Sequence, residues 1–180
     1  MSGGMGMRRV PAVTAVAVGV LTLAACLAGG GSGATPGGFT RARGHKVSVA
    51  VPKAWQSTGN GSLPVSVQAP GQAAFVEVLE DLAERGSADG LVSIAEAGPT
   101  MQAKDYRRTR AKSIKVAGAR AAQRIDYTFS DFRGAGGPGQ AVDIALLAKD
   151  DHVHDVRITW QRGRLDKKTL DHIISSIRVS

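Results

Sequence analysis

The sequence contains almost no cysteine and few aromatic residues. Cys26 is the only cysteine, and a disulfide needs two. If this thiol carries lipid, an exported domain has neither a disulfide nor redox chemistry of its own, so packing must stabilise it. Aromatic residues make up 4% of the chain, which favours core positions for Trp55 and Trp160 over the alternative, a ligand groove.

Local catalytic motifs are also missing. The chain has no Gly-x-Ser-x-Gly elbow, no Gly-x-x-x-x-Gly-Lys loop and no His-Glu-x-x-His helix. Gly134-x-Gly136-x-x-Gly139 matches the dinucleotide fingerprint, but the residues from Gln140 onward alternate as a strand and Pro138 lacks an N–H donor. A Ser-His-Asp set leaves no local motif, and nothing in the sequence points to one. We therefore expect no enzyme activity and no cofactor.

No uninterrupted apolar run is long enough to span a membrane as a helix. The longest apolar stretch covers residues 10–28 at most and is interrupted by Pro11, Thr14, Gly19 and Thr22, whereas a spanning helix needs about 20 mostly apolar residues. An uncleaved anchor and a buried core segment therefore remain as alternatives to a cleaved export signal.

The order of residue types in this run is typical of a secretory signal. Arg8 and Arg9 precede the apolar residues 10–23, and small residues follow. Leu23-Ala24-Ala25-Cys26 resembles the lipobox of bacterial lipoproteins, in which the cysteine thiol receives a diacylglyceryl group and becomes the new N-terminus. The resemblance implies a signal peptide over 1–25, a lipid anchor of the palmitate type on Cys26, and a location on the outer face of the cytoplasmic membrane.

After Cys26 the composition divides the chain into a tether and a domain. Residues 29–43 are mostly Gly, Ser, Thr, Pro and Ala, and cannot bury enough apolar surface to fold. We expect a lipidated, flexible tether over 26–44, with a reach of roughly 20–25 Å. The remaining 45–180 is long enough for one domain with a single core.

The charge favours an anionic partner. The formal net charge is +8, and removal of Arg8 and Arg9 with the signal leaves 21 basic against 15 acidic side chains, a charge of +6. Because export separates the domain from the genome, we expect anionic phospholipid, a wall polymer or a protein as partner, and no nucleic acid. Much of this charge also serves solubility.

The densest basic stretch begins at Arg107. Alternation places Arg108, Arg110 and Lys112 on one side of a strand, where they can contact an anionic surface at about 1 kcal/mol per charge. The alternative is a solvated sheet edge whose basic residues prevent edge pairing.

Hydrophobic periodicity predicts an antiparallel sheet followed by a helix. Alternating apolar residues predict strands over 46–51, 65–69, 74–82, 106–116, 120–130, 140–149 and 152–161. Asp150-Asp151 suits a tight hairpin. Asp89 is expected to cap a short helix that stops at Gly98-Pro99, and Asp166 to cap a final amphipathic helix. The predicted fold is α+β: an antiparallel β-sheet packed by this C-terminal helix and the shorter mid-chain helix.

Three short segments carry a family resemblance. Val51-Pro52-Lys53-Ala54-Trp55, the Val116–Ala121 turn leading into Ile125–Phe129, and Ile174–Val179 at the end of the last helix look like parts of the PsbP-like domains of bacterial lipoproteins. The resemblance implies an antiparallel sheet with helices on its faces. The family has no shared catalytic residues to transfer to this chain.

One pair of histidines suggests a metal site as an alternative. His152 and His154 would point to the same side of a strand, with Asp150, Asp151 and Asp155 nearby as oxygen donors. A metal site needs three or four converging ligands, and the only other histidines are His45 and His172, so a polar hairpin end is the commoner explanation of the pair. The sequence thus favours a non-catalytic binding or adaptor module, with a small metal-dependent envelope enzyme and a passive spacer as alternatives.

Overall fold

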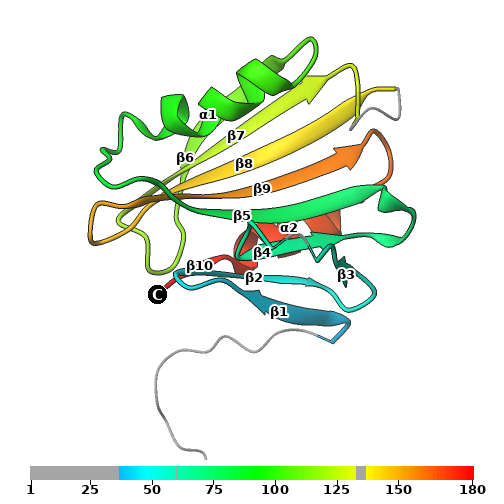
Figure 1. Ribbon diagram of the computed structural model, residues 1–180, viewed down its shortest axis with the longest axis horizontal. Helices are drawn as coiled ribbons and strands as arrows, with labels where there is room; N and C mark the ends of the chain where they lie inside the picture. The colour runs from blue at the N-terminus through cyan, green and yellow to red at the C-terminus, as the bar shows by residue number, and fades with distance from the viewer. Residues whose placement is uncertain (1–36, 60, 133–136) are drawn as a thin grey trace, which may run out of the picture. The chain divides into compact units, whose positions relative to one another are not determined.

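Two antiparallel sheets and two α-helices make up the part of the chain that this computed structural model describes, namely residues 37–59, 61–132 and 137–180. The small sheet has the order β1-β2-β10, and the large sheet the order β3-β4-β5-β9-β8-β7-β6 (Figure 1). The bounds are β1 Phe39–Arg43, β2 Val47–Pro52, β3 Gln56–Ser57, β4 Val65–Gln68, η1 Pro70–Gln72, β5 Ala74–Ala83, α1 Leu91–Gln102, β6 Arg107–Ile114, β7 Ala121–Phe129, β8 Gly139–Leu147, β9 Val153–Gln161, α2 Lys167–Ser176 and β10 Arg178–Val179.

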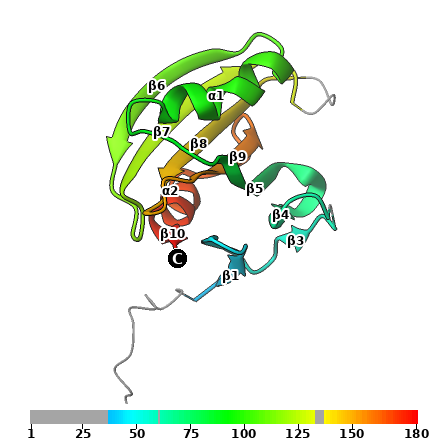
Figure 2. The same cartoon turned by 60° about the vertical axis from the view of Figure 1, so that its left-hand side comes forward.

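The large sheet is buried on both faces at its centre. On β8, Val142 and Ile144 pack into the core shared with α2 and β2, whereas Ala141 and Ala145 pack into a second core with Leu91 of α1. Figure 2 shows the two helices on opposite sides of this sheet. The sequence prediction of an α+β fold with an antiparallel sheet and two covering helices is therefore confirmed.

The last helix forms as the sequence predicts. Thr169 donates its backbone N–H to the Asp166 side chain at 2.9 Å, which satisfies one of the free donors of the first turn. Leu170 and Ile173 are buried against the large sheet and β2. At the other end, Arg41 of β1 donates to the Ser176 carbonyl at 3.1 Å, so α2 also holds the small sheet in place.

The mid-chain helix differs from its prediction at both ends. Its N-cap is Gly90, with no side-chain cap, so the cap predicted at Asp89 is wrong. The helix also continues through Pro99 to Gln102. Pro99 is buried, and this burial offsets the lost N–H bond near the helix end.

The tether predicted over 26–44 is wrong in its last residues. Phe39–Arg43 form β1, which pairs with β2, and Phe39 and Ala42 pack against the core. The predicted signal peptide and Cys26 lie outside the described residues. Among the helices of the described part, none is both long and apolar enough to cross a membrane.

Candidate functional site

A cleft of about 430 Å³ opens between the C-terminal end of α1 and the large sheet. The extension of α1 past Pro99 builds one wall of it, and Arg157 and Tyr127 contribute from the sheet. The cleft is lined by Glu77, Pro99, Gln102, Ala103, Lys104, Tyr127, Phe129, Asp131, Arg157 and Thr159. This set mixes both charge signs with aromatic surface but includes no histidine or cysteine, so it suits binding of a small polar group.

Beside the cleft lies a buried ionic network. Arg157 donates from Nε and Nη2 to the two carboxylate oxygens of Asp143 at 3.0 and 3.1 Å, and the Tyr127 hydroxyl donates to Asp143 at 3.3 Å. Burial raises the pKa of the Asp143 carboxyl, and the charge and hydrogen bonds of Arg157 offset part of that rise. Burial also raises the pKa of the Tyr127 hydroxyl, which keeps it a neutral donor.

Asp155 is the least satisfied member of this network. It is fully buried, and neither carboxylate oxygen has a hydrogen-bond partner among the described residues. Its nearest cation is Arg157, with Nη2 at 3.6 Å. Burial, and next the negative charge of Asp143, raise the pKa of Asp155 well above its usual value, which favours the protonated carboxyl.

Asp143, Arg157 and Tyr127 were not among the functional residues predicted from the sequence. Alternation predicted strands over 140–149 and 152–161 and singled out neither Asp143 nor Arg157. The signal was the run Ala-Val-Asp-Ile-Ala-Leu-Leu, which is apolar at nearly every position. Such a run indicates a strand buried on both faces, where an aspartate must have a partner.

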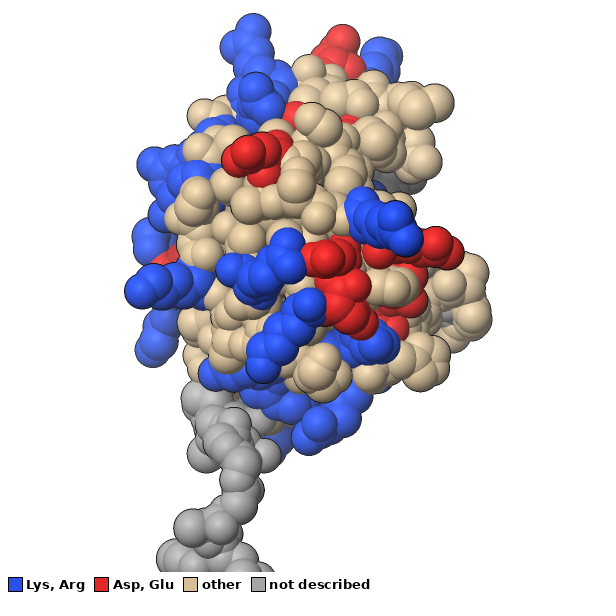
Figure 3. Space-filling view, turned by 90° about the vertical axis from the view of Figure 1, so that its left-hand side faces the viewer, with Lys and Arg blue, Asp and Glu red and all other residues tan. Residues whose placement is uncertain are grey.

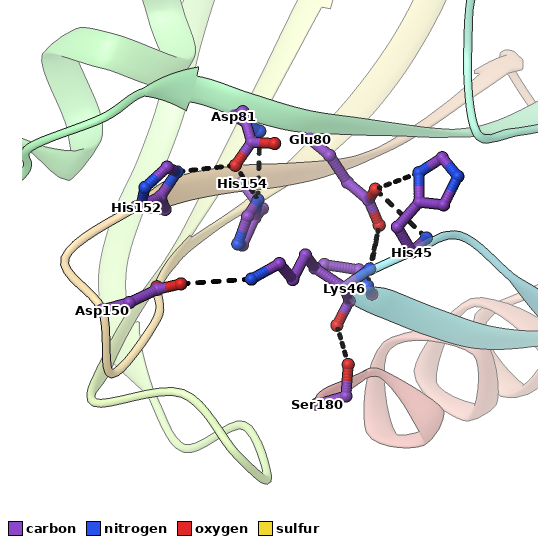
Figure 4. Close-up of polar contacts among 9 residues, drawn as sticks. His45, Lys46, Glu80, Asp81, Asp150, His152, His154 and Ser180 are labelled. Atoms are coloured by element: carbon purple, nitrogen blue, oxygen red, sulfur yellow. Dashed lines mark hydrogen bonds and ion pairs between the residues drawn. The ribbon is translucent and has the colours of Figure 1, made fainter.

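The two histidines of the predicted metal alternative approach one carboxylate (Figure 4). His152 Nδ1 lies 2.7 Å from Asp81 Oδ1, whereas His154 Nδ1 accepts the Asp81 backbone N–H at 3.1 Å. His154 is fully buried and its Nε2 has no partner among the described residues. Across those residues, no group of three His, Cys, Asp or Glu side chains is arranged to hold a metal ion, so the geometry does not favour the metal alternative.

Beside the histidines, Glu80 joins the two sheets. Its carboxylate accepts the backbone N–H groups of Lys46 and Val47 at 2.7 and 2.8 Å, and that of His45 at 3.2 Å. A Cβ at Gly44 would overlap the Glu80 carboxylate, so a larger residue in this turn would displace that carboxylate from its hydrogen bonds. We assign this end of the molecule a structural role, because the Glu80 contacts fasten β2 and the turn before it to β5, while the Asp81 contacts fasten His152 and His154 to β5.

His154 predicts an acid-sensitive fold. Burial lowers the pKa of its imidazole, although the surrounding Asp81, Glu80 and Asp150 carboxylates oppose this. Below about pH 6.5 the His154 imidazole takes up a proton in the unfolded chain but stays neutral in the folded protein. The contribution of His154 to the free energy of unfolding is therefore complete above that pH and is lost as the pH falls through the lowered pKa.

We therefore expect urea unfolding measured from pH 7 to pH 5 to show a larger loss of stability for the unmodified protein than for His154→Gln. A matched control is His45→Gln, because the His45 side chain is 90% exposed. Equal pH slopes for the protein and His154→Gln would contradict the assignment.

The basic stretch lies on β6, at the edge of the large sheet. Its pairing with β7 is Arg107 to Thr128, Arg108 to Tyr127, Arg110 to Asp126 and Lys112 to Arg124, with a bulge at Thr109. Cross-strand partners share a face, so the bulge places Arg108 on the α1 side and Arg110 and Lys112 on the other. The prediction that all three share one side is wrong.

The register instead assembles a different trio. Arg107, Arg110 and Lys112 share the face that is opposite to α1, and all three are exposed. Arg108 instead forms an ion pair with Glu96 of α1 at 2.8 Å. Two of the three predicted contact residues therefore remain available for an anionic partner, and Arg107 takes the place of Arg108.

No family model matches this chain, and no curated protein sequence matches it. The solution structure of cyanobacterial PsbP (CyanoP) from Synechocystis sp. PCC 6803 superposes with a TM-score of 0.57 over 85% of this chain and 98% of that one. The fold is PsbP-like. At 14% sequence identity, the PsbP-like match establishes the arrangement of sheets and helices and nothing about the ligand.

A crystal structure from Bacteroides thetaiotaomicron is also similar, with a TM-score of 0.48, 11% identity, and coverage of 74% of this chain and 45% of that one. The family resemblance inferred from the sequence is thus confirmed for the PsbP-like fold. Lipidation at Cys26 and the lipobox residues Leu23, Ala24 and Ala25 stay predictions, because they precede the described residues.

Proposed function

We propose that this protein is a lipid-anchored, non-catalytic binding module on the outer face of the cytoplasmic membrane. The observation that carries the proposal is Leu23-Ala24-Ala25-Cys26 directly after a basic and apolar leader. The PsbP-like domain begins with β1 at Phe39, so only about a dozen residues separate the lipidated cysteine from the first strand. Such a length holds a domain within roughly 20 Å of its anchor.

The described surfaces support binding in preference to catalysis. The cleft at the end of α1 has polar and aromatic lining residues without histidine or cysteine, and Arg157 beside it is already paired with Asp143. Arg107, Arg110 and Lys112 form a basic row on the sheet edge. A charged edge on a domain that is tethered to the membrane suits an adaptor that binds a protein or an envelope component.

Replacement of Cys26 tests the anchor. In Cys26→Ala we expect the protein to leave the membrane fraction or to accumulate with its leader uncut, because alanine offers no thiol for the diacylglyceryl group. The measurement is the distribution of the protein between washed membranes and supernatant, followed by immunoblot. Ala25→Cys in the Cys26→Ala background is a matched control that moves the thiol by one residue.

The distribution of Cys26→Ala between the membranes and the supernatant decides between a lipid anchor and an uncleaved helix. A Cys26→Ala protein that remains in washed membranes at the wild-type level and size would contradict the lipid anchor and favour an uncleaved apolar helix. Release of the variant by more than about tenfold over the wild type supports the proposal, since loss of a lipid anchor removes about 0.8 kcal/mol per buried CH₂.

A further inference from the structure

The structure assigns a partner to the outer edge of β6: we infer that this edge binds an acidic, extended segment of a partner protein by strand addition. The inference rests on the proposed binding function and names the class of partner. It uses backbone groups as well as charge, because an added strand pairs main chain to main chain along a free sheet edge.

β6 is the longest edge strand in the described residues. It has 8 residues and pairs only with β7, and its side chains are exposed at every position but the last. The opposite edge of the same sheet, β3, has only 2 residues. A long strand with one unpaired edge offers a row of N–H and C=O groups for pairing.

The charges on β6 select the occupant. The strand contains Arg107, Arg108, Arg110 and Lys112 and no acidic residue. A second copy of β6 added antiparallel would set basic side chains opposite one another, which is destabilising. A strand with acidic residues at alternate positions would set carboxylates opposite the same cations. The basic residues of β6 therefore disfavour pairing with a second copy of β6 and favour pairing with an acidic strand.

The cations of the row are not neutralised within the described residues. Asp126, across from Arg110, is already held by three hydrogen bonds from Arg124, the shortest at 2.6 Å. Glu96 is engaged by Arg108 and by the Tyr106 hydroxyl. No described carboxylate lies within ion-pair distance of Arg107, Arg110 or Lys112, so these three charges are available to a partner.

The arrangement favours a polypeptide over a membrane surface. Arg110 and Lys112 are two residues apart on one strand, a spacing of about 6.8 Å that equals the repeat of alternate side chains in a paired strand. The bulge at Thr109 places Arg107 on the same face, opposite Thr128 of β7. Figure 3 shows Lys and Arg side chains along the left side and across the lower part of this face, with Asp and Glu side chains interrupting them toward the centre. A bilayer would need a broad basic face, whereas a row on a strand edge matches one extended chain.

The test uses the full-length protein in neutral detergent and a fluorescein-labelled peptide of alternating Glu and Val. Two control peptides carry Lys in place of Glu, or the same Glu-Val sequence with all of its backbone amides N-methylated. Fluorescence anisotropy reports binding. The protein variant is Arg110→Glu/Lys112→Glu, and its matched control is Arg162→Glu/Arg164→Glu, which makes the same charge change at exposed residues outside β6.

We expect the Glu-Val peptide to bind and the Arg110→Glu/Lys112→Glu variant to bind it at least about tenfold more weakly, with the control variant retaining most of the affinity. Circular dichroism checks that both variants are folded. We also expect the N-methylated peptide to lose binding, because it keeps the charge and cannot donate the hydrogen bonds.

Equal binding of the N-methylated peptide would overturn strand addition and show a polyanion site that acts by charge alone. Absence of binding up to about 1 mM peptide would also overturn it. The peptide contacts the folded domain whether or not Cys26 is lipidated, so these results do not test the lipid anchor. The membrane fractionation of Cys26→Ala tests the anchor independently.

Discussion

Arg157→Leu is expected to lower the free energy of unfolding by about 3–5 kcal/mol. Arg157 is the only described cation in contact with Asp143, which is 1% exposed, and with the fully buried Asp155. Its removal leaves the buried Asp143 carboxylate without its two hydrogen bonds from Arg157 and without a compensating charge, and desolvation of an unpaired carboxylate is costly. Urea unfolding followed by the fluorescence of the buried Trp160 measures the loss.

The chain offers a matched control for this variant. Arg124 forms a similar pair with Asp126, and its side chain is 17% exposed, as is that of Arg157. Asp126, however, is 20% exposed, so Arg124→Leu is expected to cost about 1 kcal/mol or less. Equal losses in the two variants would show that the buried position of Asp143 has no special cost.

Gly118→Ala is expected to destabilise the fold by about 3 kcal/mol, from backbone strain and overpacking together. Gly118 has φ +86°, and a Cβ there would overlap the backbone carbonyl of Val179. The contact matters because Val179 of β10 donates its N–H to the Ala117 carbonyl at 2.9 Å, which closes the C-terminus onto this turn.

Gly163→Ala separates the two contributions to this loss. Gly163 has φ +78°, similar to that of Gly118, but a Cβ there would meet nothing within 4 Å. We expect this control to cost about 1 kcal/mol, the strain alone. Thermal or urea unfolding of both variants measures the difference, and a Gly118→Ala protein as stable as Gly163→Ala would contradict the close approach of the C-terminal strand.

Segments with a clear period were predictable from the sequence. The valines of β2, the alternation of β7 to β9 and the Asp166 cap of α2 each depend on neighbouring residues, so local reasoning finds them. β1 escaped prediction because its apolar residues, Phe39 and Ala42, follow a Gly-rich segment and gain their strand structure from pairing with β2. The end of α1 was misplaced because the burial of Pro99 is a tertiary effect.

The candidate binding surfaces were harder to predict because they depend on which helix or strand packs on each face of the large sheet. The basic stretch was correctly recognised as charged, but a single bulge at Thr109 moved Arg108 to the other face and brought Arg107 into the row. Asp143 and Arg157 lie on the face opposite to the alternating apolar residues that predict β8 and β9. Only the packing of α1 on that face reveals them as a buried pair.

We propose that a lipid on Cys26 fixes this PsbP-like domain to the membrane. Mass spectrometry of the N-terminal peptide of protein extracted from membranes tests it most directly. We predict a peptide that begins at Cys26, lacks residues 1–25 and carries the added mass of a diacylglyceryl group. A peptide that begins upstream of Cys26, or an unmodified Cys26 in the membrane-bound protein, would contradict the account.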